Sequence, residues 1–69
     1  MSELSFASVE RVIRNAGAER ISYDAISAMA EILEDYGTKM SKEALELAKH
    51  AKRKMVKKED VKLAARRMV

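Results

Sequence analysis

The sequence predicts an all-α domain of three helices, in which the central helix is much longer than its two neighbours. Proline is absent from the 69 residues and glycine occurs only twice, so little interrupts helix formation. Apolar residues recur at three- and four-residue spacing over three segments, which is typical of helices with one buried face. We expect a single domain over residues 1–69, because the chain is too short for two cores.

The first predicted helix follows Ser5, whose hydroxyl can cap it, and ends near Gly17, which can adopt the left-handed conformation of a helix stop. Arg11 and Arg14 lie one turn apart on another face than the apolar stripe. The stripe itself consists of Phe6, Val9, Ile13 and Ala16.

The second predicted helix begins after Ser22, a plausible N-cap, and has no strong stop before about His50. It would span about 29 residues and roughly 43 Å. A compact monomer of this size is only about 28 Å across. Two short helices would leave much of its apolar surface uncovered, so we expect a second copy of the chain to cover it.

Gly37 lies in the middle of this long segment, where glycine costs about 1 kcal/mol relative to alanine. The cost is understandable if two long helices cross there with their backbones close together. The alternative is that Gly37 divides the segment into two helices of a four-helix bundle. After the second helix, the segment "KRKMV" predicts a short extended piece. A third helix is expected over about Lys58–Met68. We expect that helix to bury Val61, Ala64, Ala65 and Met68.

Charge is distributed unevenly along the chain. Residues 1–36 contain three basic and seven acidic side chains, whereas residues 37–69 contain eleven basic and four acidic ones. This asymmetry indicates a polyanionic partner, although a solvated basic helix face is the alternative. With no cysteine and one histidine, we expect no metal, no cofactor and no enzymatic activity. No apolar run approaches about 18 residues, so we expect a soluble intracellular protein without a membrane partner.

The segments "NAGAERIS" and "HAKRKMVKKEDVKLAARR" resemble an archaeal histone, whose family shows "AGAERVS" and a "HAGRKTIKAEDIELA"-like run at the same separation. The resemblance implies a histone fold that forms an obligate head-to-tail handshake dimer. It also implies binding and compaction of double-stranded DNA with little sequence preference, and assembly of dimers into tetramers or longer stacks. The partner chain would be a second copy or a paralogous histone. The protein would be located in the cytoplasm, on the chromosome.

In this family the loop after the first helix lies beside the partner's loop before the third helix. Met55 and Val56 would then form a short strand against the partner's first loop, and Arg20 would enter the minor groove, where the potential is most negative. Methionine at position 55 departs from the usual threonine, which would hold that arginine, so we expect weaker binding. The resemblance assigns the DNA contacts to Arg11, Arg14, Arg20, Ile21, Ser22, Lys54, Met55, Val56 and Lys57.

Further roles follow from the same resemblance. Arg53 and Asp60 would form a salt bridge within one chain. A dimer–dimer contact would pair His50 with Asp60 of the next dimer and so strengthen as the pH falls toward about 6. Gly17 would allow close stacking or simply end its helix, and the sequence does not separate the two. The residues assigned to the dimer–dimer contact are Leu47, His50, Asp60 and Leu63.

Two other functions compete with this interpretation. The chain could be a histone-fold protein–protein module of a transcription complex, but such modules often lack the loop cations found here. It could also be a small helical RNA-binding protein. Recognition of single-stranded RNA generally uses clustered aromatic side chains, and we expect Phe6, Tyr23 and Tyr36 not to cluster. The N-terminus reads "LSFASVER" where the family commonly has "LPIAPIGR", so this chain lacks the family's prolines in the first turn that meets DNA.

Overall fold

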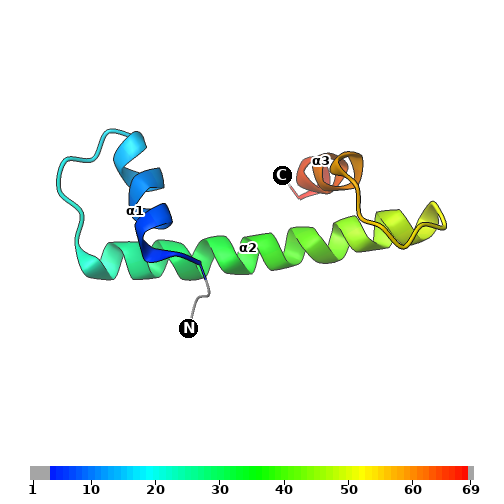
Figure 1. Ribbon diagram of the computed structural model, residues 1–69, viewed down its shortest axis with the longest axis horizontal. Coiled ribbons are helices and arrows are strands. Elements are labelled where there is room, and N and C mark those ends of the chain that lie inside the picture. Colours follow the sequence, from blue (N-terminus) through cyan, green and yellow to red (C-terminus); the bar gives the residue numbers. More distant parts are fainter. Residues whose placement is uncertain (1–3, 69) are drawn as a thin grey trace. The chain divides into compact units, whose positions relative to one another are not determined.

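The computed structural model describes residues 4–68, which form three helices and no strand: α1 (Phe6–Asn15), α2 (Tyr23–His50) and α3 (Lys58–Arg67) (Figure 1). The predicted order of a short, a long and a short helix is confirmed. Because α2 is continuous over 28 residues, the alternative in which Gly37 divides it is wrong. The chain comprises two compact units, Met1–Asp35 and Tyr36–Val69.

Local chemistry explains where α1 ends and α2 begins. Ser5 has an extended backbone, and its hydroxyl accepts a hydrogen bond of 3.4 Å from the Ser8 N–H. Gly17 has a φ of +111°, and its N–H donates to the Arg14 carbonyl (2.9 Å). The Ser22 hydroxyl accepts from the Ala25 N–H (3.1 Å) at the start of α2. All three predicted helix signals are therefore confirmed.

The first unit has a small core between α1 and the first part of α2, which α1 crosses in Figure 1. Its buried residues are Val9, Ile26 and Ala30. Phe6 and Ala16, which belong to the predicted stripe of α1, remain exposed. The partly buried side chains around this core are Ile13, Ile21 and Met29.

The second unit packs α3 against the last part of α2 (Figure 1). Its buried apolar residues are all alanines, at positions 44, 48 and 64, which allow the two helix backbones to approach closely. An ion pair of 2.8 Å between Arg67 and Glu43 joins the end of α3 to α2. The prediction that α3 buries Val61 is wrong for the single chain, because Val61 is exposed.

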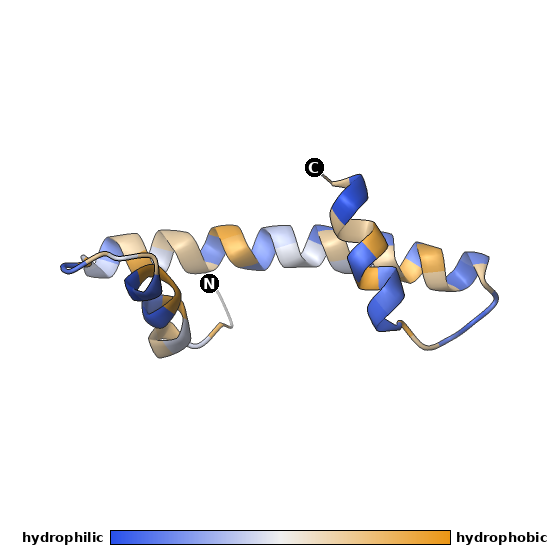
Figure 2. Ribbon diagram, turned by 90° about the horizontal axis from the view of Figure 1, so that it is seen from above, coloured by the Kyte–Doolittle hydropathy of each residue, from blue (hydrophilic) through white to orange (hydrophobic). Residues whose placement is uncertain are grey.

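The middle of α2 has no cover within either unit. From residue 31 to residue 43 no side chain is buried. Even the apolar Ile32 is 63% exposed, and Tyr36 is 45% exposed. In Figure 2 hydrophobic residues lie on both parts of α2, with a neutral to hydrophilic stretch between them. Burying a side chain of this size contributes roughly 1.5–3 kcal/mol, and no large apolar side chain is fully buried among residues 4–68. These exposed residues therefore favour association with another chain.

The C-terminus of α2 closes with a pair of backbone hydrogen bonds typical of a helix stop. The Arg53 N–H donates to the Ala48 carbonyl and the Lys52 N–H donates to the Lys49 carbonyl, both at 2.9 Å. This motif places Lys52 in the left-handed region, with a φ of +59°. Glycine usually fills such a position, because the Cβ of any other residue is strained there.

We expect replacement of Lys52 by glycine to stabilise the protein by about 1 kcal/mol, as relief of the Cβ strain exceeds the added entropy of the unfolded chain. Urea unfolding followed by circular dichroism measures the change. The variant Lys52→Ala is the matched control, because it removes the charge and keeps the Cβ. Equal stability of the glycine and alanine variants would contradict the strain argument.

Candidate nucleic-acid interface

The loop after α1 carries Arg20, Ile21 and Ser22 on one side of an open hollow of about 520 Å³. Ile21 packs against the core of the first unit and so anchors the loop, while Arg20 and Ser22 are exposed. Among residues 4–68, none of the ion pairs involves the Arg20 guanidinium. Its charge is therefore available to an external anion. The remaining residues that line the hollow are Ile13, Ala18 and Ala25.

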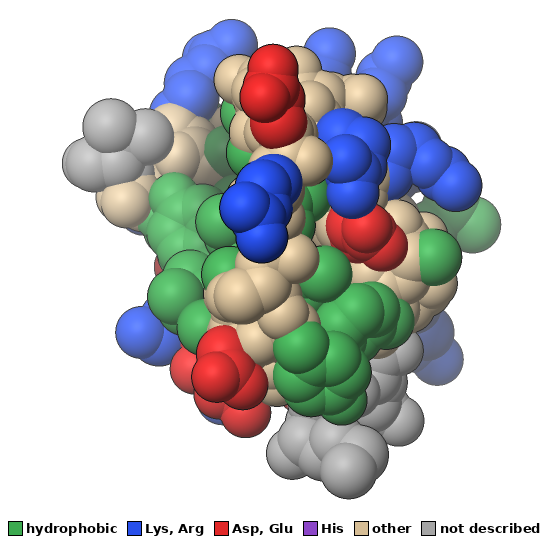
Figure 3. All heavy atoms as spheres, turned by 90° about the vertical axis from the view of Figure 1, so that its left-hand side faces the viewer, with side chains coloured by type: hydrophobic (Ala, Val, Ile, Leu, Met, Phe, Trp, Pro, Cys, Tyr) green, Lys and Arg blue, Asp and Glu red, His purple; other side chains and the backbone are tan. Residues whose placement is uncertain are grey.

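The α1 arginines lie beside this loop and differ in their surroundings. Arg14 forms an ion pair of 2.8 Å with Glu10 and donates a second hydrogen bond to the Glu19 carbonyl (3.4 Å). Arg11 shares a shallow hollow of about 280 Å³ with Ala7, Glu10 and Arg14. Figure 3 faces this end of the first unit, where basic side chains project and hydrophobic ones are exposed beside them.

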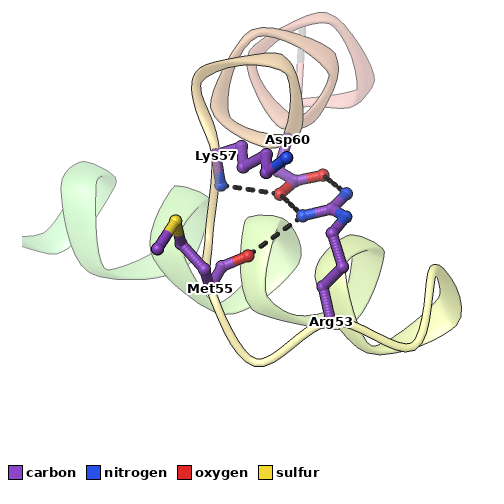
Figure 4. A network of polar contacts seen from close by, with 4 residues as sticks. All are labelled: Arg53, Met55, Lys57 and Asp60. Carbon is purple, nitrogen blue, oxygen red and sulfur yellow. Dashed lines mark hydrogen bonds and ion pairs between the residues drawn. The ribbon is translucent and has the colours of Figure 1, made fainter.

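The loop before α3 is held by one arginine and one aspartate (Figure 4). Arg53 donates through Nη1 to Oδ2 and through Nη2 to Oδ1 of Asp60, both at 2.9 Å. Arg53 Nη1 also donates to the Met55 carbonyl (3.0 Å), and Asp60 Oδ2 accepts from the Lys57 N–H (2.8 Å). Four hydrogen bonds thus fix the loop to the start of α3.

Arg53 and Asp60 each stabilise the ionised form of the other. The hydrogen bonds from Arg53 and from the Lys57 N–H lower the pKa of Asp60 from 3.8 to about 2, and the Asp60 carboxylate raises the pKa of Arg53. Asp60 is only 5% exposed, yet all its neighbours at hydrogen-bond distance are donors. The carboxylate is therefore ionised at neutral pH and keeps the loop in place.

Four exposed residues follow Arg53 in this fixed loop. Lys54 and Lys57 are exposed cations, although the charge of Lys57 also contributes to the low pKa of Asp60. Met55 is 68% exposed. Val56 is exposed too, although it is apolar. The predicted strand at positions 55 and 56 requires the partner chain and stays a prediction. The loop thus presents two cations with two apolar side chains between them.

The residues expected at a dimer–dimer contact lie in the second unit. Leu47 is half-buried and His50 is exposed, one turn apart at the end of α2, while Leu63 is exposed on α3. Asp60 is buried and already accepts three hydrogen bonds. A histidine from another dimer would therefore have to donate to a lone pair of Asp60 that is not already used. Gly37 has open space around its Cα within this chain, so nothing in the chain itself requires glycine there.

One aromatic contact contradicts the sequence-based expectation. The rings of Phe6 and Tyr23 have their centroids 4.8 Å apart at an angle of 30°, so these two residues do cluster. Tyr23 is 72% exposed, which leaves one face of the pair open to solvent. The expected absence of clustering therefore no longer argues against single-stranded nucleic acid as the ligand.

Residues 2–65 match the family described as histone-like transcription factor (CBF/NF-Y) and archaeal histone. The chain belongs to this histone-fold family. It is 54% identical over 66 residues to one of the subunits of archaeal histone HAN1 from Thermococcus zilligii, covering 96% of this chain and 98% of that protein. It is 47% identical, with the same coverage, to probable archaeal histone 3 of Methanocaldococcus jannaschii.

Family membership confirms the resemblance inferred from "NAGAERIS" and the basic segment that follows α2. A histone-fold chain of this kind is a DNA-binding chromatin protein and not an enzyme. No helix among residues 4–68 combines the length and apolar character needed to span a bilayer. The aromatic pair of Phe6 and Tyr23 is thus a feature of a histone-fold protein and does not by itself indicate RNA binding.

Sequence reasoning missed two features of this interface. The ion pair between Glu10 and Arg14 has the i,i+4 spacing of helix surface pairs, so the signal was present in the sequence. The hydrogen bond from Arg53 to the Met55 carbonyl had no sequence signal, because it depends on the path of the loop.

Proposed function

We propose that two copies of the chain pair head to tail and that the dimer binds and compacts duplex DNA at the chromosome, with little sequence preference. The observation that carries the proposal is the pair of anchored loops that keep Arg20, Lys54 and Lys57 exposed. Such cations suit a ligand with regularly spaced phosphates, because affinity grows with the number neutralised together.

The two loops also complement each other as surfaces. The hollow beside Arg20 has apolar walls from Ile13, Ile21 and two alanines, and the loop before α3 presents exposed Met55 and Val56. A head-to-tail pair would place the partner's Met55 and Val56 against that hollow. This contact would bury apolar surface and bring cations from both chains to one edge of the dimer.

Binding of this kind needs no base-specific hydrogen bond. The two loop lysines would neutralise phosphates, and Arg20 would enter the narrow minor groove, where guanidinium insertion is favourable for many sequences. The Ser22 hydroxyl accepts a hydrogen bond from the Ala25 N–H, and its own proton remains free to donate to a phosphate oxygen. Arg11 and Arg14 would add contacts from α1.

Titration of unrelated duplexes and of a single strand at several salt concentrations tests the proposal. Three loop cations per chain give six per dimer, so log K should fall against log salt with a slope of about −5 or steeper. We expect similar affinities for all duplexes. A preference for the single strand would instead favour stacking on Phe6 and Tyr23, and a flat salt response would contradict the phosphate contacts.

Larger assemblies would form through Leu47, His50, Asp60 and Leu63, with Gly17 allowing layers to approach. Nuclease digestion of reconstituted complexes distinguishes open stacks of dimers from a closed particle. A ladder in dimer-sized steps indicates open stacks, whereas one protected length indicates a closed particle.

Pairing with a different histone chain is the second candidate for the dimer. The Thermococcus zilligii relative is named as one of the subunits of archaeal histone HAN1. A purely protein-binding role in a transcription complex is less well supported, because the exposed cations of both loops would then have no ligand.

We expect Met55→Thr to raise duplex affinity about fivefold per site, because the added hydroxyl can hydrogen bond the partner's Arg20, and one such bond contributes about 1 kcal/mol. Fluorescence anisotropy at matched salt measures the change. Met55→Val is the control, since it is β-branched like threonine and lacks the hydroxyl. An equal gain in both variants, or none in Met55→Thr, would contradict the role given to the hydroxyl.

A further inference from the structure

The side of α1 that carries Arg11 and Arg14 also carries a carboxylate. Glu10 lies at 2.8 Å from Arg14 Nη2, and both side chains are partly exposed. The second hydrogen bond of Arg14, to the Glu19 carbonyl at 3.4 Å, directs its other terminal nitrogen toward the loop after α1. Among the described residues, Arg14 is thus held by two acceptors, whereas Arg11 and Arg20 have no side-chain partner.

We propose that Glu10 is an intrachain competitor for DNA phosphate, which occupies Arg14 in the free protein and so lowers the affinity of α1 for duplex DNA. This inference rests on the proposed function. Glu10 lines the same shallow hollow as Arg11 and Arg14, so a phosphate that reaches these arginines meets a negative charge already in place. The chain therefore limits its own DNA affinity at the helix that approaches the backbone.

The contact is of the right strength for this role. An exposed i,i+4 pair contributes little to stability, so DNA can displace the carboxylate without unfolding α1. The displaced carboxylate nevertheless stays on the same helix turn, where it repels the phosphate that replaces it. Competition of this kind reduces the gain from Arg14 and leaves the contacts of Arg20 and the loop lysines unaffected.

A double-mutant cycle tests the inference directly. We expect Glu10→Gln to raise duplex affinity about three- to tenfold at 0.1 M salt and to steepen the salt slope by up to about 2 per dimer. In the Arg14→Gln background the same Glu10→Gln change should have a much smaller effect, because the arginine that it releases is absent. Circular dichroism should show unchanged helix content for all variants.

Glu46→Gln is the matched control, because Glu46 pairs with Lys49 at 3.9 Å near the end of α2 and its loss changes the net charge equally. An equal affinity gain for Glu10→Gln and Glu46→Gln would overturn the inference, as would an equal gain with and without Arg14. Wild-type protein that does not bind duplex DNA in dilute salt would contradict the proposed function instead, so the two failures are distinguishable.

Discussion

Replacing Arg20 with alanine is expected to lower duplex affinity by at least tenfold and to reduce the steepness of the salt dependence by about 2 per dimer. Each dimer would lose two guanidinium groups that have no side-chain partner among the described residues and lie on an anchored loop. Each lost phosphate or groove contact removes roughly 0.9 from the slope of log K against log salt. Anisotropy titrations of one duplex at four salt concentrations measure both quantities.

Two further variants show whether the position or only the charge matters. Arg66→Ala removes the same charge from an exposed site in the last turn of α3 and should change affinity far less. Arg20→Lys keeps the charge and should keep the salt slope, but its affinity should fall because an ammonium does not reproduce the planar guanidinium. Equal losses for Arg20→Ala and Arg66→Ala would show that Arg20 has no specific place on DNA.

Asp60→Ala is expected to be the most destabilising single change, with a fall in the thermal midpoint of about 10 °C. The substitution removes the acceptor of three hydrogen bonds, leaves Arg53 without its carboxylate and releases the loop before α3. DNA affinity should fall as well, because Lys54 and Lys57 lose their fixed positions. Glu59→Ala is the control, since Glu59 is the neighbouring exposed carboxylate in the first turn of α3.

The same pair predicts a defined acid sensitivity. Because the pKa of Asp60 is about 2 in the folded chain and 3.8 in the reference state, its contribution to stability is complete above about pH 5. The contribution should be lost as the pH falls from about 4 to 2. The Asp60→Asn variant lacks this component of the stability. The difference between the thermal midpoints of the wild type and the variant should therefore shrink as the pH falls. Parallel pH profiles would contradict the assignment.

The ends of the helices were predictable from sequence because they depend on neighbouring residues. Ser5 and Ser22 cap helices through hydrogen bonds to N–H groups three residues ahead, and Gly17 ends α1 through its own backbone conformation. None of these interactions needs knowledge of the tertiary fold. The archaeal histone resemblance then supplied the pairing of Arg53 with Asp60, which are seven residues apart and joined through a loop.

Features that depend on packing were harder to predict. The stack of Phe6 on Tyr23 joins two helices, and spacing within one helix contains no information about it. The burial expected for Val61 assumed that helical periodicity alone decides which face is covered, whereas the single chain leaves that residue exposed. The strain at Lys52 follows from the geometry of the helix stop, which the sequence did not reveal because lysine replaces the usual glycine.

The exposed middle of α2 is expected to require a second chain. Sedimentation equilibrium of the purified protein at micromolar concentration tests it directly, with circular dichroism on the same sample to show that the helices are formed. We predict a helical species of twice the 7.8 kDa chain mass, with no folded monomer. A fully helical species of 7.8 kDa that remains single with Ile32 and Tyr36 exposed would contradict the account.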